Sequence, residues 1–163
     1  MKLLFGLPFT ALAAVPALAD DGGVFALWGE DSGALPPQYA RAYSVTFTAD
    51  RRGAVRCCKG YADAAPGCAT ATFRLSERRF ADLQDALAPL ASDLAARPAV
   101  QDPNPPVGGG SVGGRVTLNG AELPLWSYPL PDDAARVGAV IALLRENTPG
   151  DALFNARSHA VQP

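Results

Sequence analysis

All three cysteines of this 163-residue chain lie in one short segment, VRCCKGYADAAPGCATATF, residues 55–73. The two ends of the segment alternate apolar and polar residues, which is the pattern of half-buried β-strands. Because successive side chains of a strand point to opposite faces, the adjacent Cys57 and Cys58 cannot share a face. The segment therefore predicts two neighbouring strands, 54–59 and 68–75, with the adjacent cysteines on opposite faces of the sheet.

Strand parity also predicts which cysteines pair. Val55 and Cys57 face the core, which leaves Cys58 on the solvent face. Cys68 lies on the solvent face of the next strand, so Cys58 and Cys68 meet at the base of the connecting loop, within bridging reach. We expect a Cys58–Cys68 disulfide, with Cys57–Cys68 as the alternative pairing. Cys57 is then a free buried thiol that behaves as a small hydrophobic residue.

The cysteines fit neither a metal site nor a redox site. A structural zinc site needs four ligands at characteristic spacings, and the single histidine, His159, is remote from the cysteines. A copper site draws on His and Met, and the one methionine is Met1. A thioredoxin-like centre uses Cys-x-x-Cys at a helix N-terminus rather than cysteines in strands. The sequence predicts no metal and no cofactor.

The first 19 residues, MKLLFGLPFTALAAVPALA, have the three parts of a secretory signal peptide. Lys2 precedes an apolar run, and Ala17 and Ala19 are the small residues that signal peptidase requires. Pro8 and Pro16 interrupt the run, which is shorter than the roughly 20 residues of a transmembrane helix. We expect cleavage after Ala19 and a periplasmic or secreted protein, in a compartment where paired cysteines oxidise.

Cleavage would leave 13 basic and 16 acidic residues, because the leader holds one basic and no acidic residue. Such a surface has no general attraction for nucleic acid or anionic lipid. No later run of residues is apolar and long enough to span a membrane. The composition argues against nucleic acid as a partner and against a membrane span after signal removal.

The pattern of the remaining residues predicts alternating strands and helices. Residues 42–48 and 54–59 form a hairpin around a turn at 50–53, and residues 68–75 add a third strand. Ser76 caps an amphipathic helix whose apolar residues recur at spacings of three and four. Pro89 lies inside this helix, where we expect a kink or a break.

A second hairpin and a second helix follow. The dipeptide Asn119-Gly120 is a strong signal for a two-residue hairpin turn, which pairs Leu118 with Ala121. Pro124 lacks an amide donor and therefore predicts an edge position for its strand. The sequence Pro131-Asp132-Asp133 opens the second helix, which ends at Pro149-Gly150.

The expected fold is α+β: an antiparallel sheet of about five strands with two helices packed on one face, in the order βββ-α-ββ-α. Residues 20–150 form this single domain, in which residues 98–114 are a Pro-rich and Gly-rich surface loop. Residues 20–40 are expected to be irregular, with Phe25 and Trp28 as attachments to the core. Residues 151–163 are expected to be a C-terminal tail.

Basic residues are concentrated between Arg51 and Arg79. This segment contains seven basic residues and only two acidic ones, Asp63 and Glu77. A charge run of this kind is usually a solvated face. Its functional interpretation is a surface for an acidic protein or an anionic envelope polymer. The residues of this predicted basic surface are Arg51, Arg52, Arg56, Lys59, Tyr61 and Arg74.

No catalytic residue is predicted. His159 lies close to the C-terminus without a neighbouring nucleophile, and Ser111 in GGGSVGG does not match a nucleophile elbow. The glycine run from Gly108 to Gly114 lacks the Gly-Lys-Ser/Thr ending of a phosphate loop, which favours a flexible loop over an anion cradle. Asp132 and Asp133 are explained by the opening of a helix.

We expect a small exported protein that acts as a non-catalytic binding or interaction module of the cell envelope. It would present the exposed sheet face or the disulfide-tied loop GYADAAPG, residues 60–67, to its partner. The alternatives are an envelope enzyme whose polar groups converge only in three dimensions and, less favoured, a thiol-active or metal-handling protein. Thiol activity requires Cys57 to be accessible.

Overall fold

The computed structural model describes residues 23–161, so the predicted leader, residues 1–19, lies outside the described residues. This part of the chain forms a six-stranded antiparallel sheet and three helices. The strands lie across the sheet in the order β4-β3-β2-β1-β5-β6. In chain order the elements are β1 (Val24–Asp31), β2 (Arg41–Thr48), β3 (Arg52–Lys59), β4 (Cys68–Arg74), α1 (Glu77–Ala96), β5 (Ser111–Leu118), β6 (Ala121–Leu125), α2 (Pro131–Asn147) and α3 (Gly150–His159).

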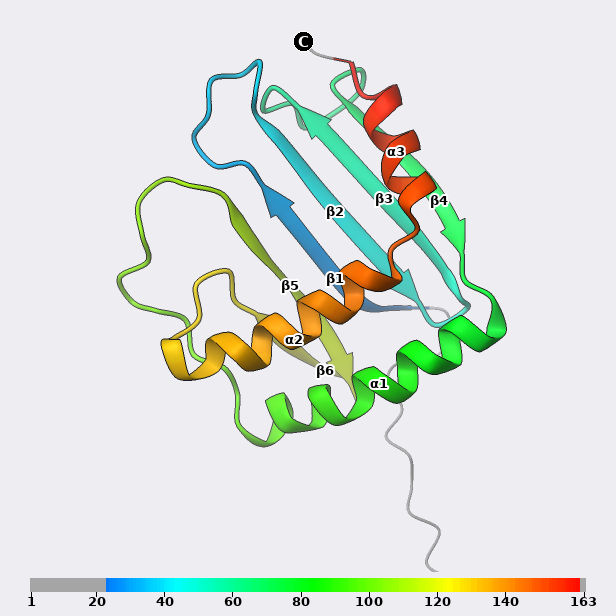
Figure 1. The fold of residues 1–163 in the computed structure, drawn as a ribbon, viewed down its shortest axis with the longest axis vertical. Coiled ribbons are helices and arrows are strands. Elements are labelled where there is room, and N and C mark those ends of the chain that lie inside the picture. The colour runs from blue at the N-terminus through cyan, green and yellow to red at the C-terminus, as the bar shows by residue number, and fades with distance from the viewer. Residues whose placement is uncertain (1–22, 162–163) are drawn as a thin grey trace, which may run out of the picture.

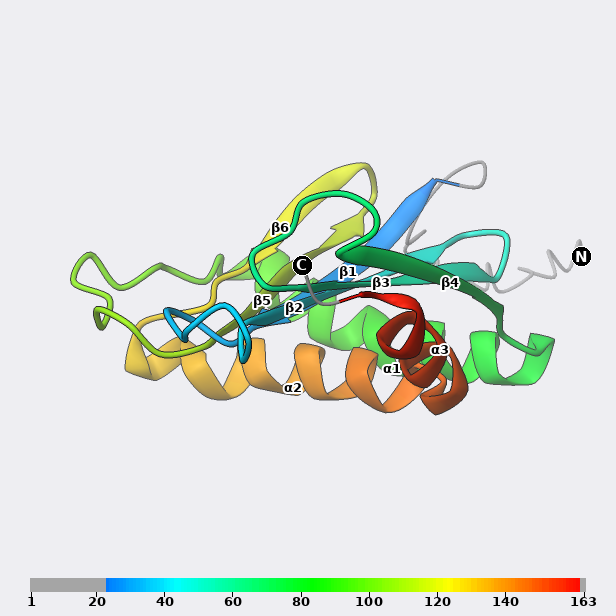
Figure 2. The ribbon, with the colours of Figure 1, turned by 90° about the horizontal axis from the view of Figure 1, so that it is seen from above.

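All three helices lie on one face of the sheet (Figure 1, Figure 2). We call this the helix face and the opposite one the open face, on which no helix of the described residues lies (Figure 2). The core fills the space between sheet and helices, with Phe47 and Val55 from the strands against Leu87 and Leu144 from α1 and α2. The α+β class and the antiparallel sheet with helices on one face are as the sequence predicts.

The second hairpin has the predicted register. Leu118 pairs with Ala121 across the Asn119-Gly120 turn, and both turn residues have positive φ, as a type I′ turn requires. Pro124 lies in β6, which is an edge strand of the sheet. The turn chemistry and the alternation of apolar residues therefore predict the same strand register in this hairpin.

Residues 24–31 form β1, a central strand, although the sequence predicts irregular chain there. A β-bulge between Val24 and Ala26 turns both Phe25 and Ala26 inward, so the period of two is broken where the strand begins. Gly29 breaks the pattern again, and a Cβ at this position would lie 2.7 Å from the carbonyl oxygen of Tyr43. The predicted burial of Phe25 and Trp28 is confirmed.

Residues 150–159 form α3, although the sequence predicts a tail from residue 151. The helix buries Ala152 and Ala156, one turn apart, and Ala160 directly after its end. Alanine is small enough to let the helix approach β3 and β4 closely, but it contributes little to an apolar pattern. The helix signal is therefore weak in the sequence.

The glycine run divides between a loop and a strand, because β5 begins at Ser111. Gly114 pairs with Trp28, and a Cβ on Gly114 would lie 2.0 Å from the carbonyl oxygen of Leu27. Only glycine fits there without a shift of the backbone. The expectation of a loop through Gly114 is therefore wrong for its last four residues.

Two local expectations also differ from the structure. The first hairpin turns at residues 49–51 rather than 50–53, with Arg51 at a φ of 70° and Gly53 already paired with Phe47. A short hairpin that ends in a left-handed residue normally uses glycine there. The helix α1 continues through Pro89 without a break, and Pro89 lies on its exposed side.

Candidate functional site

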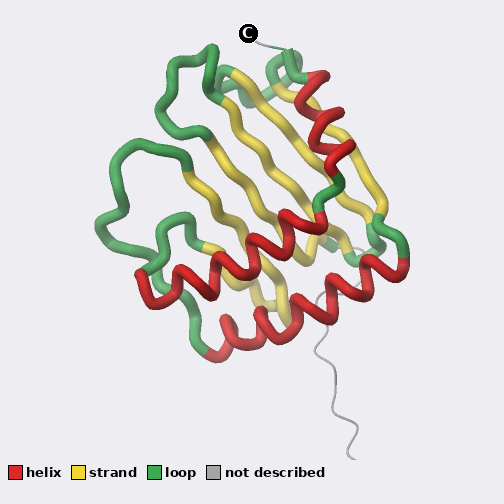
Figure 3. The backbone as a smooth tube through the Cα atoms, viewed as in Figure 1, coloured by secondary structure: helices red, strands yellow, loops and turns green. Residues whose placement is uncertain are grey.

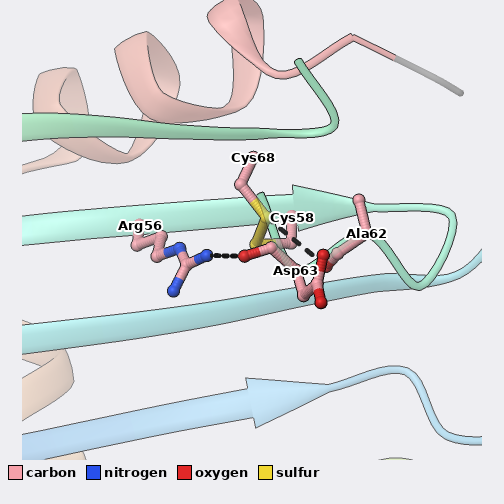
Figure 4. Close-up of a disulfide and its surroundings, with 5 residues drawn as sticks. All are labelled: Arg56, Cys58, Ala62, Asp63 and Cys68. Carbon is pink, nitrogen blue, oxygen red and sulfur yellow. Dashed lines mark hydrogen bonds between the residues drawn. A yellow bond between two sulfur atoms is a disulfide. The ribbon is translucent and has the colours of Figure 1, made fainter. Parts of the chain in front are cut away.

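The Cys58–Cys68 disulfide ties β3 to β4 on the open face, as strand parity predicts (Figure 4). Arg56 donates a hydrogen bond to the carbonyl oxygen of Asp63, and Cys68 Sγ lies 3.4 Å from the carbonyl oxygen of Ala62. These contacts hold the loop of residues 60–67 over the end of β3. The bridge therefore fixes the conformation of this loop.

The disulfide-tied loop does not project alone from the sheet. The Tyr61 hydroxyl donates to the carbonyl oxygen of Leu35 and lies 3.3 Å from that of Gly33. Tyr61 thus joins the loop to the connection between β1 and β2, although 62% of its surface stays exposed. A groove of about 390 Å³ remains between the two loops, lined by Asp31, Ser32, Gly33, Ala34, Arg41, Ala42, Cys58, Tyr61 and Ala62.

The structure separates the residues of the predicted basic surface. Arg52, Arg56 and Arg74 lie on the open face with the disulfide. Arg51 lies in the first hairpin turn and makes an ion pair of 2.6 Å with Glu77. Lys59 has the opposite parity and reaches the helix face, where its Nζ donates to the carbonyl oxygen of Ala160 at 2.6 Å. The six residues therefore do not form one patch.

Acidic groups compensate part of the positive charge on the open face. Asp50 makes a 3.2 Å ion pair with Arg52 and interacts electrostatically with Arg74. Hydrogen bonding from the Thr48 hydroxyl, ahead of the amide and charge of Arg52, lowers the pKa of the Asp50 carboxyl. Glu122 pairs with Arg115 at 3.0 Å on the same face. Arg52 and Arg115 are thus paired with carboxylates, whereas Arg56 binds only a carbonyl oxygen.

On the helix face, α2 and α3 diverge over β1, β2 and β3 (Figure 1, Figure 3). Positive side chains gather there. Two hollows of about 230 and 390 Å³ share Tyr43 and Arg157 as a common wall. We call them together the cationic cleft. Its polar and charged lining residues are Glu30, Gln38, Arg41, Tyr43, Cys57, Lys59, Arg145 and Arg157.

The smaller hollow is the more positive part of the cationic cleft. Arg41 from β2, Lys59 from β3 and Arg157 from α3 surround it. Among residues 23–161, no carboxylate lies within ion-pairing distance of these three side chains. Three positive groups from three elements therefore face one hollow without a negative partner, an arrangement that favours a bound anion.

The larger hollow adds apolar surface to the cleft. Leu153 and Phe154 of α3 line it together with Trp28, and Phe154 is 68% exposed. Arg145 on α2 lies over the Trp28 ring, 5.2 Å from its centroid, and makes a 2.7 Å ion pair with Glu30. Glu30 is the only carboxylate that lines the cationic cleft in the part of the chain that the structure describes.

The position of the cleft follows from the turn between α2 and α3. The Trp28 indole N–H donates to Thr148 Oγ1 at 3.0 Å, and the Thr148 hydroxyl donates to the carbonyl oxygen of Leu144 at 2.9 Å. Pro149 follows and cannot continue α2, so the chain changes direction into α3. This buried contact holds the corner of the cleft against β1.

Cys57 lies under the smaller hollow with no exposed surface. Burial raises the pKa of its thiol, against the opposing effects of the Tyr43 hydroxyl and the charges of Lys59, Arg157 and Arg41. Burial also raises the pKa of Tyr43, the cross-strand neighbour of Cys57. Both groups therefore stay protonated at neutral pH, and the thiol lacks the exposure that redox chemistry needs.

Other reactive groups do not converge in the described residues. His159 is exposed at the end of α3, with Nδ1 2.7 Å from the carbonyl oxygen of Asn155. Across residues 23–161, no group of three or more His, Cys, Asp or Glu side chains is placed to hold a metal ion. No helix in this range is long and apolar enough to cross a membrane.

The sequence pattern identifies only Lys59 and Cys57 among the polar residues of the cleft. Arg41, Arg145 and Arg157 belong to three separate elements, and none of them lies in the basic run that the sequence shows. Arg145 and Arg157 share one partial signal, because each is a basic residue in the last turn of its helix.

Searches of protein-family models, curated proteins and solved structures found no significant match to this chain.

Proposed function

We propose that this protein is an exported, non-catalytic binding module of the cell envelope that holds an organic anion in the cationic cleft. The observation that carries the proposal is the excess of Arg41, Lys59 and Arg157 over carboxylates at one hollow. The sequence suggests an acidic protein or an anionic envelope polymer as the partner. The proposed ligand shares their negative charge, but its binding surface lies on the helix face instead of the open face.

The two hollows favour a ligand with two chemically different ends. Guanidinium and ammonium groups around the smaller hollow would bind a carboxylate, sulfonate or phosphate group by charge-assisted hydrogen bonds. Leu153 and Phe154 offer an apolar wall next to it, and the exposed face of Phe154 suits an aromatic or alkyl group. The ligand class is therefore an anion with an apolar body.

Binding suits the cleft better than catalysis does. A catalytic acid or base needs a pKa near the working pH, whereas burial raises the pKa values of Tyr43 and Cys57 above their already high ordinary values. Arg145 holds the Glu30 carboxylate in an ion pair. Tyr43 and Cys57 therefore both stay protonated at neutral pH.

Calorimetric titration of the mature protein tests the proposal with three probes. Naphthalene sulfonate offers a charge and an aromatic body, inorganic sulfate offers the charge alone, and naphthalene sulfonamide offers the body alone. We expect naphthalene sulfonate to bind most tightly, and its affinity to fall as salt is added. If the neutral sulfonamide binds as tightly as the sulfonate, the cleft does not select anions.

Charge reversal locates the binding. R157E should weaken naphthalene sulfonate binding by about tenfold or more, because an attractive charge becomes a repulsive one. R78E is the matched control, since the Arg78 side chain is 93% exposed on α1, away from the cleft. An equal loss of affinity in both variants would mean that binding follows net charge and not the cleft.

Export is tested separately by the intact mass of the protein isolated from the envelope. We expect a chain that begins at Asp20, with a mass that shows one disulfide. Alkylation of the unfolded protein before and after reduction should add one and then three labels. A retained leader would contradict export by the expected signal, without bearing on the anion site.

A further inference from the structure

We propose that the outer edge of β4 pairs with β4 of a second copy of this chain, so that the two sheets become continuous across a two-fold axis. The inference is independent of anion binding, because the residues of β4 lie outside the cationic cleft. It rests on the contrast between the two edges of the sheet and on the self-complementarity of β4.

The sheet protects one edge and leaves the other open. At the β6 edge, a strand of five residues includes Pro124, which cannot donate a hydrogen bond, and Glu122. The β4 edge is seven residues long, has no proline, and is paired with β3 without a bulge. Long, regular and uncharged edges invite pairing with another strand. Arg74, at its end, is the one charged residue of β4.

Hydrogen-bond parity shows which backbone groups point outward from β4. The amide of Lys59 donates to Gly67 at 3.0 Å, and the amide of Leu75 donates to Arg51 at 2.9 Å, so odd-numbered residues of β4 bond to β3. Cys58 and Cys68, with Cα atoms 4.1 Å apart, form a narrow pair without such bonds. Thr70, Thr72 and Arg74 therefore direct their N–H and C=O groups to the free edge.

The strand is complementary to itself when two copies run antiparallel. In the register that overlaps the whole strand, Ala71 lies on the two-fold axis opposite its own copy. Thr70 then faces Thr72 of the second copy on the open face, and Arg74 faces Cys68. On the helix face, Ala69 faces Phe73, which places a small side chain opposite a large one. No like charges are opposed, and isologous pairing of this kind closes as a dimer.

Sedimentation analysis over micromolar to millimolar concentrations tests the pairing with charge variants of the mature protein. T70K/T72K places lysines opposite each other across the two-fold axis and should be monomeric, as should T70E/T72E. An equal mixture of the two variants should form a heterodimer through opposite charges. Circular dichroism of each variant tests whether it is folded. Formation of a heterodimer in the mixture would exclude a general loss of structure.

S44K/T46K is the matched control on the same face. Ser44 and Thr46 pair with Arg56 and Ala54 from one side, as Thr70 and Thr72 do from the other. This variant carries the same added charge within the sheet and should remain a dimer. A wild-type protein that is monomeric at every concentration overturns the proposal, and so does a T70K/T72K variant that still dimerises.

Discussion

Arg145 on α2 and Glu30 on β1 are joined across the cationic cleft by an ion pair of 2.7 Å, and the guanidinium also lies over the Trp28 ring. Glu30 is thus the acidic partner of one cleft arginine, whereas Arg41 and Arg157 have no such partner among residues 23–161. The pair divides the positive charge of the cleft into a compensated part and a part that is free to bind an anion.

Neutralising Glu30 should therefore strengthen anion binding. In E30Q, Arg145 loses its acidic partner and a negative charge leaves the cleft, so we expect about fivefold tighter binding of naphthalene sulfonate. Calorimetric titration measures the change. E146Q is the control, because Glu146 is an exposed carboxylate of α2 that does not line the cleft. Weaker binding by E30Q than by E146Q would contradict the expected role of Glu30.

The buried hydrogen bond between Trp28 and Thr148 should stabilise the corner between α2 and α3. T148V leaves the indole N–H without an acceptor, and we expect it to lower the free energy of unfolding by about 1–3 kcal/mol. T148S keeps the hydroxyl and isolates the effect of the lost methyl group. Urea unfolding compares the two variants, and an equal loss in both would show that the hydrogen bond contributes nothing.

The three cysteines should differ in reactivity. We expect no thiol of the native protein to react with an alkylating reagent and one thiol, Cys57, to react after unfolding without reductant. C58S/C68S should lower the free energy of unfolding by about 2–3 kcal/mol, because the short cross-linked loop gains freedom mainly in the unfolded chain. Labelling of Cys57 in the folded protein would contradict its burial and reopen thiol chemistry.

Asp133 should stabilise the protein at neutral pH, and this contribution should be lost in acid. The amide of Val100, ahead of the Arg136 guanidinium, lowers the pKa of the Asp133 carboxyl in the folded state. A lowered folded pKa gives stability that is present above the ordinary carboxyl pKa and is lost as the pH falls through the folded value. Wild type should therefore exceed D133N in stability at pH 7, and the difference should shrink below about pH 4.

Thermal unfolding across this pH range measures the difference. The control is D132N, because Asp132 is the exposed neighbour of Asp133 in the first turn of α2. A difference between wild type and D133N that stays constant down to about pH 2 would show that titration of Asp133 does not control acid stability.

The sequence predicts those parts of the fold that depend on local rules. The cysteine parity and the Asn119-Gly120 turn each require only the alternation of neighbouring side chains, so the disulfide and the second hairpin follow from them. In β1, a bulge breaks that alternation, and in α3 alanines replace the larger apolar residues that signal a helix. Both elements depend on contacts with distant segments.

The cationic cleft cannot be predicted from local rules, for the same reason. Arg41, Arg145 and Arg157 are ordinary surface residues in the sequence, and only the change of direction at Thr148 and Pro149 brings them to one place. The basic run near the cysteines is visible in the sequence, but the pairing of its residues with acids is not. Asp50, in the turn before the run, forms an ion pair with Arg52. Net charge along a chain does not show which charges are compensated in space.

The most direct test of the anion site is to map naphthalene sulfonate binding by the backbone amide shifts of the isotopically labelled mature protein. We expect saturable shifts at Arg41, Tyr43 and Arg157, with Leu153 and Phe154 also affected and the open-face strand residues Thr46 and Thr70 unchanged. Shifts centred on the open face, or no saturable shift at the cleft residues, would contradict the assignment of the cationic cleft as the binding site.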